Sequence, residues 1–91
     1  MNISSVRIRI CNSAGAPLGF ASLVIDDAYV VYGIRIIRRK NGSPQILYPE
    51  AAHVRGKDGN KAYAFRPINS EAHSRIEKAI LEAYQRKLKE M

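Results

Sequence analysis

In this 91-residue chain, the residues whose types and spacing could do chemistry form three groups of basic side chains. The first is a run directly before an Asn-Gly pair: Arg38, Arg39 and Lys40. The second lies in a glycine-containing segment: Arg55, Lys57 and Lys61. The third group contains basic residues and one glutamate, spaced three or four residues apart: Arg75, Lys78, Glu82, Arg86 and Lys89. Guanidinium and ammonium groups bind phosphate oxygens, so these cations are the candidate nucleic-acid contacts.

The formal net charge of +7, from 15 Lys and Arg against 8 Asp and Glu, attracts polyanions. Nucleic acid is the commonest polyanion, but an acidic protein or an anionic lipid matches the charge equally well. Cations near strand ends also discourage edge pairing. In the third group, Glu71 with Arg75 and Glu82 with Arg86 have the spacing of a solvated, ion-paired helix face. Charge alone therefore leaves both interpretations open for each group.

The residues available for catalysis form no recognisable pattern. His53 and His73 are far apart in sequence, and Cys11 has no neighbouring base. The only paired carboxylates, Asp26 and Asp27, have the setting of a tight turn. There is no Ser-His-acid arrangement, metal-ligand spacing or glycine-rich phosphate loop. We therefore expect no enzyme activity, no cofactor, no metal and no small-molecule substrate, and Cys11 to be a buried apolar residue.

The cysteine count and the absence of long apolar stretches indicate the cellular compartment. A single Cys excludes an intramolecular disulfide, which favours a reducing compartment. No stretch has the pattern of a secretory signal, and none approaches the ~18 apolar residues of a membrane-spanning helix. We expect a cytoplasmic protein without membrane contact.

The elements that must position these cations begin with two strands. Between residues 3 and 10, apolar and polar side chains alternate, as in a strand with one wet face that carries Arg7 and Arg9. Residues 12–17 are rich in turn formers and predict a loop before a second strand at 18–25. Asp26 and Asp27 then close a hairpin.

The third strand, predicted at 29–37, is β-branched and almost wholly apolar apart from Gly33 and Arg35. This composition is typical of a central strand covered on both faces. Asn41-Gly42 predicts a two-residue type I′ turn into a fourth strand at 45–48. Pro49 ends that strand, and 53–61 is expected to be a mobile basic loop or hairpin tip before a short strand at 62–65.

Three tyrosines admit two interpretations. Tyr29, Tyr32 and Tyr48 could stack on bases if any of them shares the surface of Arg7 and Arg9. Alternatively, they are core or dimer-interface residues with the hydroxyl group at the rim.

The C-terminal segment predicts one long amphipathic helix from about 69 to 90. Pro67, the capping candidates Asn69 and Ser70, and Glu71 are typical of a helix start. One apolar stripe follows at helical spacing: Ala72, Ile76, Ala79, Ile80, Ala83, Tyr84 and Leu88. The expected fold is α+β, a single domain over 1–91 with an antiparallel four- to five-stranded sheet in the strand-rich part, 1–66, and this helix.

Read in order, five segments resemble the SpoVG (sporulation stage V protein G) family. They are VRIR at 6–9, ASLVIDD at 21–27, VVYGIRII at 30–37, NG at 41–42, and RPINSE at 66–71 ahead of the helix. The last is the most specific. Some residues depart from the family pattern: Arg66 stands where a His is usual, Tyr32-Gly33 where His-Asp is usual, and Tyr48-Pro49-Glu50 where Met-Pro-Ser is usual. The acidic tail common in the family has no counterpart in this sequence.

The resemblance implies a homodimeric, sequence-preferring DNA- or RNA-binding regulator linked to sporulation and septation, without catalytic residues. The family's basic loop maps onto Arg55 and Lys57, and its basic helix position onto Arg75. A chain this short buries little surface alone, which also favours dimerisation. The alternative is a protein–protein interaction module of the division and septation machinery, in which the segment 29–37 or the helix end makes the contact without direct binding of nucleic acid.

Overall fold

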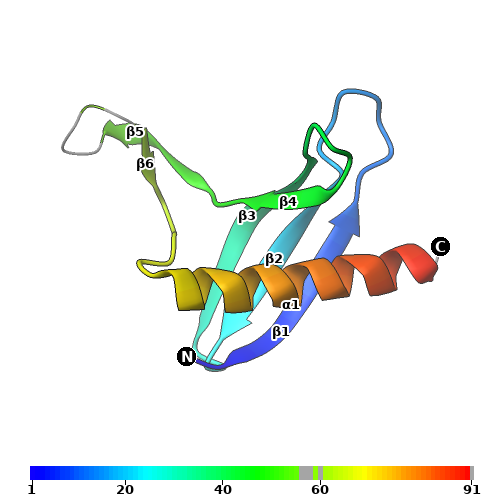
Figure 1. Ribbon diagram of the computed structural model, residues 1–91. Coiled ribbons are helices and arrows are strands. Elements are labelled where there is room, and N and C mark those ends of the chain that lie inside the picture. The colour runs from blue at the N-terminus through cyan, green and yellow to red at the C-terminus, as the bar shows by residue number, and fades with distance from the viewer. Residues whose placement is uncertain (56–58, 60, 91) are drawn as a thin grey trace.

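A four-stranded antiparallel sheet and one helix that crosses it form the body of the molecule (Figure 1). The computed structural model describes residues 1–55, 59 and 61–90, without the side chains of 52–55 and 61. The sheet has the order β1-β2-β3-β4: β1 (Ile3–Ile10), β2 (Gly19–Ile25), β3 (Tyr29–Arg38) and β4 (Pro44–Leu47). The hairpin of β5 (Glu50–Arg55) and β6 (Lys61–Tyr63) follows, and then α1 (Ser70–Lys89). The predicted α+β class is confirmed.

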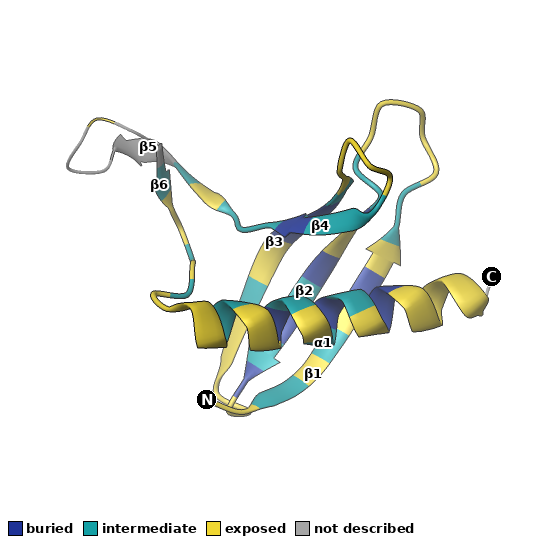
Figure 2. Ribbon diagram, viewed as in Figure 1, coloured by how far each residue is buried: buried dark blue, intermediate teal, exposed yellow. Residues whose placement is uncertain are grey.

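The core lies between α1 and one face of the sheet, where the side chains are apolar. Ile76 and Ile80 of α1 are buried, and so are residues of the two middle strands, among them Leu23, Ile34 and Ile36. Figure 2 shows buried residues along the sheet-facing side of α1 and in the strands behind it. Each buried Leu or Ile side chain contributes roughly 1.5–3 kcal/mol, so this one layer supplies most of the hydrophobic stabilisation.

The helix begins with a side-chain cap, as its sequence predicts. Asn69 is extended, with φ of −145°, and its Oδ1 accepts a hydrogen bond from the Ala72 N–H at 2.8 Å. Pro67 therefore precedes the cap and does not occupy the first turn. Ile76, Ile80, Ala83 and Tyr84 of the predicted stripe are buried. Leu88 is exposed, because the last turns of α1 extend past β1 (Figure 1).

The two tight hairpins use different turns. Asp26 and Asp27 both have positive φ, 55° and 51°, as expected for a two-residue turn. The type I′ turn predicted for Asn41-Gly42 is wrong, because only Gly42 has positive φ. The Gly42 N–H donates to the Arg39 carbonyl at 2.9 Å, so a type I turn is followed by a left-handed glycine. Asn41 Oδ1 accepts from the Ser43 N–H at 3.0 Å, which stabilises this longer loop.

The strand β5 was not predicted. It begins directly after Pro49, and Glu50 pairs with Tyr63 while Arg55 pairs with Lys61. The segment is rich in alanine and lacks an alternating pattern, so its own sequence favours a strand only weakly. Pairing with β6 supplies the backbone hydrogen bonds. The last strand ends at Tyr63, two residues before the predicted limit.

A glycine bulge in β3 decides which side chains face α1. Ala21 pairs with Ile34, but Leu23 pairs with Val31, so β3 has one extra residue against β2. Gly33 lies within this step and has φ of +80°. A glycine in the left-handed region is the usual form of such a bulge. Because of the extra residue, side chains an even number of positions apart lie on opposite faces of the sheet when Gly33 stands between them.

The expectation that this strand is covered on both faces is wrong. Val30 and Tyr32 lie on the face away from α1, where they line a hollow with Arg7. Tyr32 is 68% exposed and Val30 is 48% exposed. The apolar run of β3 therefore serves one buried face and one face that no described residue covers.

We expect Gly33→Ala to lower the free energy of unfolding by roughly 1–2 kcal/mol, because a Cβ disfavours the left-handed conformation. The space itself is open, since an added Cβ would meet only Pro49 Cβ at 3.7 Å. Urea unfolding measures the effect. Gly33→Asn is the matched variant and should lose less, because Asn tolerates positive φ. An alanine variant as stable as the parent chain would contradict the bulge.

Candidate nucleic-acid interface

The first basic group forms a corner between β3 and β4, which we call the basic corner: Arg38, Arg39 and Lys40. Arg38 ends β3, and the other two residues lie in the turn. All three are exposed. The Arg39 Nη2 atom lies 3.7 Å from Oε2 of Glu77 in α1. The basic corner is therefore attached to the helix by an ion pair that partly neutralises Arg39.

A polar network continues from this ion pair to the end of β4. The His73 Nε2 atom is 3.7 Å from the same Glu77 oxygen, and His73 Nδ1 is 2.8 Å from the Tyr48 hydroxyl. The Tyr48 ring packs against Phe65, with centroids 6.0 Å apart. If the phenol donates to Nδ1, the imidazole carries its proton on Nε2, facing Glu77. The network joins β4, α1 and the basic corner.

Burial and, secondarily, the negative charge of Glu77 raise the pKa of Tyr48 to about 12. Both effects disfavour the phenolate, because an anion here would lose hydration and lie near a carboxylate. Tyr48 therefore remains a neutral hydrogen-bond donor throughout the physiological pH range. Of the three tyrosines with two open interpretations, Tyr48 is half-buried, whereas Tyr29 and Tyr32 are exposed.

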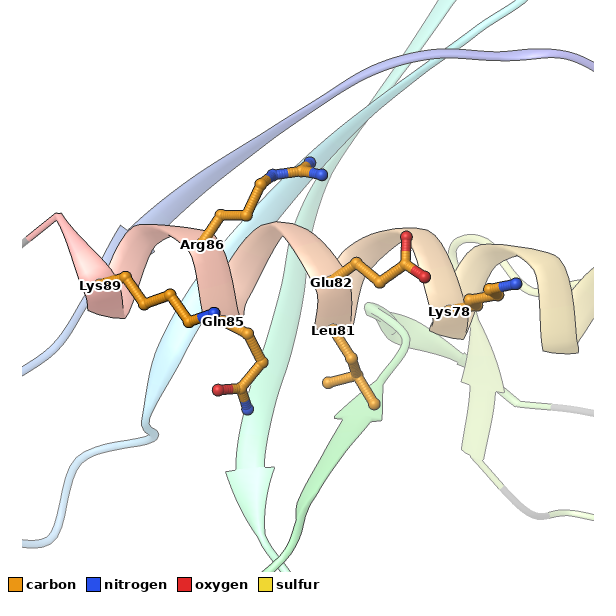
Figure 3. A pocket seen from close by; sticks show the side chains of 6 residues that line it. All are labelled: Lys78, Leu81, Glu82, Gln85, Arg86 and Lys89. Atoms are coloured by element: carbon orange, nitrogen blue, oxygen red, sulfur yellow. The ribbon is translucent and has the colours of Figure 1, made fainter.

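The third basic group lies along the outer side of α1, and we call it the helix row: Arg75, Lys78, Glu82, Arg86 and Lys89. All five residues are exposed. Figure 3 shows several of these side chains around a shallow hollow of about 440 Å³ that also includes Leu81 and Gln85. In the part of the chain that the structure describes, neither Glu71 with Arg75 nor Glu82 with Arg86 forms a salt bridge. Among the described residues, the cations of the helix row therefore have no direct ion-pair partner.

Two members of the second basic group, Arg55 and Lys61, belong to the β5–β6 hairpin. The backbones of Arg55 and Lys61 pair across it. Their side chains are not described, and Lys57 lies outside the described residues. The structure thus shows a hairpin where the sequence left open a loop or a hairpin tip.

The predicted contacts do not converge on one site. Glu77, which holds Arg39, is two residues from Arg75, or about 200° around the helix. The basic corner and the helix row therefore lie on different sides of α1. Their roles as nucleic-acid contacts remain predictions.

Sequence reasoning placed Arg7 and Arg9 on one wet face but left open which other side chains share it. This surface is the sheet face opposite α1, which we call the open face. In one transverse row, Phe20 of β2 pairs with Arg9 of β1 and with Arg35 of β3. The next row brings Arg7 opposite Ser22. The interruption at Gly33 was the available signal, because a glycine inside a strand often marks a bulge.

The described residues contain no group of three or more His, Cys, Asp or Glu that could hold a metal ion. Cys11 is only partly buried, contrary to expectation, and lies at the end of β1. Within the same described part, no helix is both long and apolar enough to cross a membrane.

Comparison with known proteins gives a family match over most of the chain. The family model described as SpoVG matches residues 1–86. This chain belongs to the SpoVG family. The resemblance carried by the five sequence segments is thereby confirmed.

Several curated SpoVG relatives cover nearly the whole chain. "Putative septation protein SpoVG" of Desulforudis audaxviator is 35% identical over 85 residues, covering 93% of this chain and 92% of the relative. The protein of the same name from Clostridium beijerinckii is 36% identical over 90 residues, or 99% and 94% of the two chains. "Putative septation protein SpoVG 2" of Listeria monocytogenes is 33% identical over 86 residues, or 94% and 80%. These names describe septation proteins and state no enzymatic activity.

The raised pKa of Tyr48 allows the network to be tested at alkaline pH. Its pKa is about 12 in the folded chain against 10.0 for an unperturbed tyrosine. Between these values the unfolded chain has lost a proton that the folded chain keeps, so this contribution to stability is complete below pH 10 and is lost as the pH rises towards 12. We expect Tyr48→Phe to flatten the loss of stability in this window.

The measurements are urea unfolding at pH 9 and pH 11, and tyrosinate absorbance as a function of pH. Tyr63→Phe, at an exposed tyrosine, is the matched control. If both variants show the same titration and the same alkaline loss of stability, the Tyr48 site is not desolvated as described.

Proposed function

We propose that this chain is a nucleic-acid-binding regulatory protein of the SpoVG type, which acts as a homodimer and contacts phosphates through its basic loop and helix residues. The helix row is the observation that carries the proposal. Its cations are exposed on one side of α1 and lack direct ion pairs among the described residues. The net charge of +7 supplies a sequence-independent attraction to polyanions.

The dimensions of the helix row suit a phosphate backbone. From Arg75 to Lys89 the row is about 21 Å long at 1.5 Å per residue. Phosphates of one strand recur at about 3.4 Å along a duplex axis, so the row spans roughly six of them. Each phosphate contact by Lys or Arg releases condensed counterions, which is the source of affinity in this mode of binding.

The names of the relatives suggest the process in which this binding acts. We infer a role in the control of septation and sporulation, exercised through gene regulation in the cytoplasm. Phosphate contacts position a protein on nucleic acid, whereas base contacts determine sequence preference. The basic corner and the β5–β6 hairpin are candidates for additional phosphate contacts.

Removing charge from one basic group at a time should show which of the three groups contact phosphates. We expect the affinity for duplex DNA to fall steeply with salt, and Arg75→Gln with Lys78→Gln to reduce the slope of log affinity against log salt by up to about 1.8, which corresponds to two phosphate contacts. The pairs Arg38→Gln with Lys40→Gln and Arg55→Gln with Lys57→Gln test the other two groups in the same way. Fluorescence anisotropy with a labelled duplex over a salt series measures each slope.

A charge-matched control removes two cations elsewhere, Arg66→Gln with Lys87→Gln; the Lys87 amino group lies 4.0 Å from Glu90. This control should lower the affinity slightly and keep the slope. An affinity that does not depend on salt, or identical slopes for all four double variants, would count against phosphate contacts at these positions.

The edge of β3 supports the homodimer. β4 pairs only with the C-terminal half, Arg35–Arg38, so in the described part of the chain the edge from Tyr29 to Ile34 has no strand beside it. Tyr29 is 69% exposed at this edge, next to an apolar hollow of about 470 Å³ formed with Pro49 and Phe65. Unpaired strand edges are templates for pairing with a second chain. A second copy would cover this edge.

We expect a dimer in analytical ultracentrifugation at micromolar concentration. Tyr29→Lys should shift the population towards monomer, because a lysine at an edge opposes pairing and the symmetry of a dimer brings two lysines together. Tyr63→Lys places the same charge at an exposed tyrosine of β6 and should leave the dimer intact. A parent chain that sediments as a monomer would refute the proposed assembly.

The same edge favours a second candidate function, an interaction module for a protein of the septation machinery. In that case the partner occupies the apolar edge of β3, and the cations serve solubility. Salt-independent association with a purified division protein, unaffected by nuclease and lost in Tyr29→Lys, would favour this function. Salt-dependent binding of a duplex by the parent chain, without association with the division protein, would favour the first.

A further inference from the structure

The open face of the sheet combines aromatic and cationic side chains on a surface that no described element covers. Helix α1 lies on the other face (Figure 1). We propose that the open face binds single-stranded nucleic acid, with Tyr32 and Phe20 stacking on bases and Arg7, Arg9 and Arg35 contacting phosphates. This inference rests on the proposed nucleic-acid-binding function and adds a second surface with its own ligand class.

The strand register places the Phe20 ring next to two guanidinium groups. Phe20 is directly opposite Arg9 on one side and Arg35 on the other. Side chains in such positions have Cβ atoms about 4.5–5.5 Å apart, so the ring lies between two cations. Phe20 is 38% exposed, which leaves part of the ring accessible to a ligand. An aromatic platform flanked by cations suits a base and its neighbouring phosphates.

A second platform lies one pleat away, where the Gly33 bulge turns Tyr32 outwards. A hollow of about 300 Å³ is lined here by Ser5, Arg7, Ser22, Val24, Val30 and Tyr32. One wall is the tyrosine ring, the valines are apolar, and the two serine hydroxyls can donate to or accept from a base edge. Arg7 provides a cation at the same hollow. The chemistry fits a planar, polar-edged ring joined to an anion.

The charge of the open face selects among possible occupants. The face carries three arginines, and the described carboxylate at its border, Glu50, is 3.7 Å from Arg35 Nη2. A second copy packed through the same face would bring like-charged arginine clusters together across the symmetry axis, which opposes association. A nucleic acid brings the complementary charge.

The aromatic rings select the single-stranded form. In a duplex the flat faces of the bases are stacked on one another and are not available to side chains. In single strands they are free to stack on aromatic rings and on guanidinium planes. The open face is on the side of the sheet opposite the helix row, so the two ligand classes have separate surfaces.

The experiment measures binding of a labelled oligothymidylate and of a labelled duplex by fluorescence anisotropy. Tyr32→Ala should weaken binding of the single strand by roughly 5- to 100-fold, the range of one base–aromatic stack, and leave duplex binding unchanged. Tyr32→Phe keeps the ring and should keep the affinity. Tyr63→Ala removes an exposed tyrosine outside the open face and is the matched control.

Two further readouts identify the mechanism. Arg9→Gln should reduce the salt slope for the single strand by about 0.7, the value for one lost phosphate contact. Because the chain contains no Trp, its intrinsic fluorescence is that of tyrosine, and oligothymidylate should quench it in the parent chain more than in Tyr32→Ala.

The outcomes separate this inference from the proposed function. If Tyr32→Ala binds the single strand as tightly as the parent chain does, the open-face site is overturned, while salt-dependent duplex binding preserves the proposed function. If neither ligand binds, both proposals fall. If Tyr32→Ala changes the sedimentation of the chain from dimer to monomer, the open face is an interface between copies and the inference is overturned.

Discussion

The burial of one sheet face under α1 is the interaction on which the rest of the structure depends. Ile76 and Ile80 must be buried against the two middle strands, away from water. This requirement fixes the rotation of the helix about its axis. The cations of the helix row then face solvent, because they lie on the opposite side. The same packing leaves the other sheet face without a cover. Both candidate binding surfaces are therefore consequences of where the apolar side chains lie.

The network from Tyr48 to Arg39 adds a second, polar connection between sheet and helix. It fixes the start of α1 relative to the end of β4 and attaches the basic corner to the middle of the helix. The corner is thus not an independent loop. A change in the position of α1 would also move Arg39.

Sequence reasoning predicted the elements whose patterns are strictly periodic and missed those set by a local irregularity. The alternation of residues 3–10, the Asp26-Asp27 hairpin and the apolar stripe of the helix were sufficient to place those elements. The bulge at Gly33 is one residue long and reverses the faces of Tyr32 and Val30, which a reading by period 2 cannot detect. For the site, the sequence identified which residues are charged. Only the register showed that Arg9, Phe20 and Arg35 are neighbours.

The order of the strands has a consequence for how the chain folds during its synthesis. In the four-stranded sheet, β2, β3 and β4 each pair with the strand made just before, so the sheet can form progressively from local hairpins, which are fast to close. The helix, however, is made after the strands and packs against β1, the first of them. Until α1 has been synthesised, the apolar face of the sheet has no cover and is prone to associate with other chains. Docking of α1, more than formation of the strands, is the step at which this molecule acquires its core.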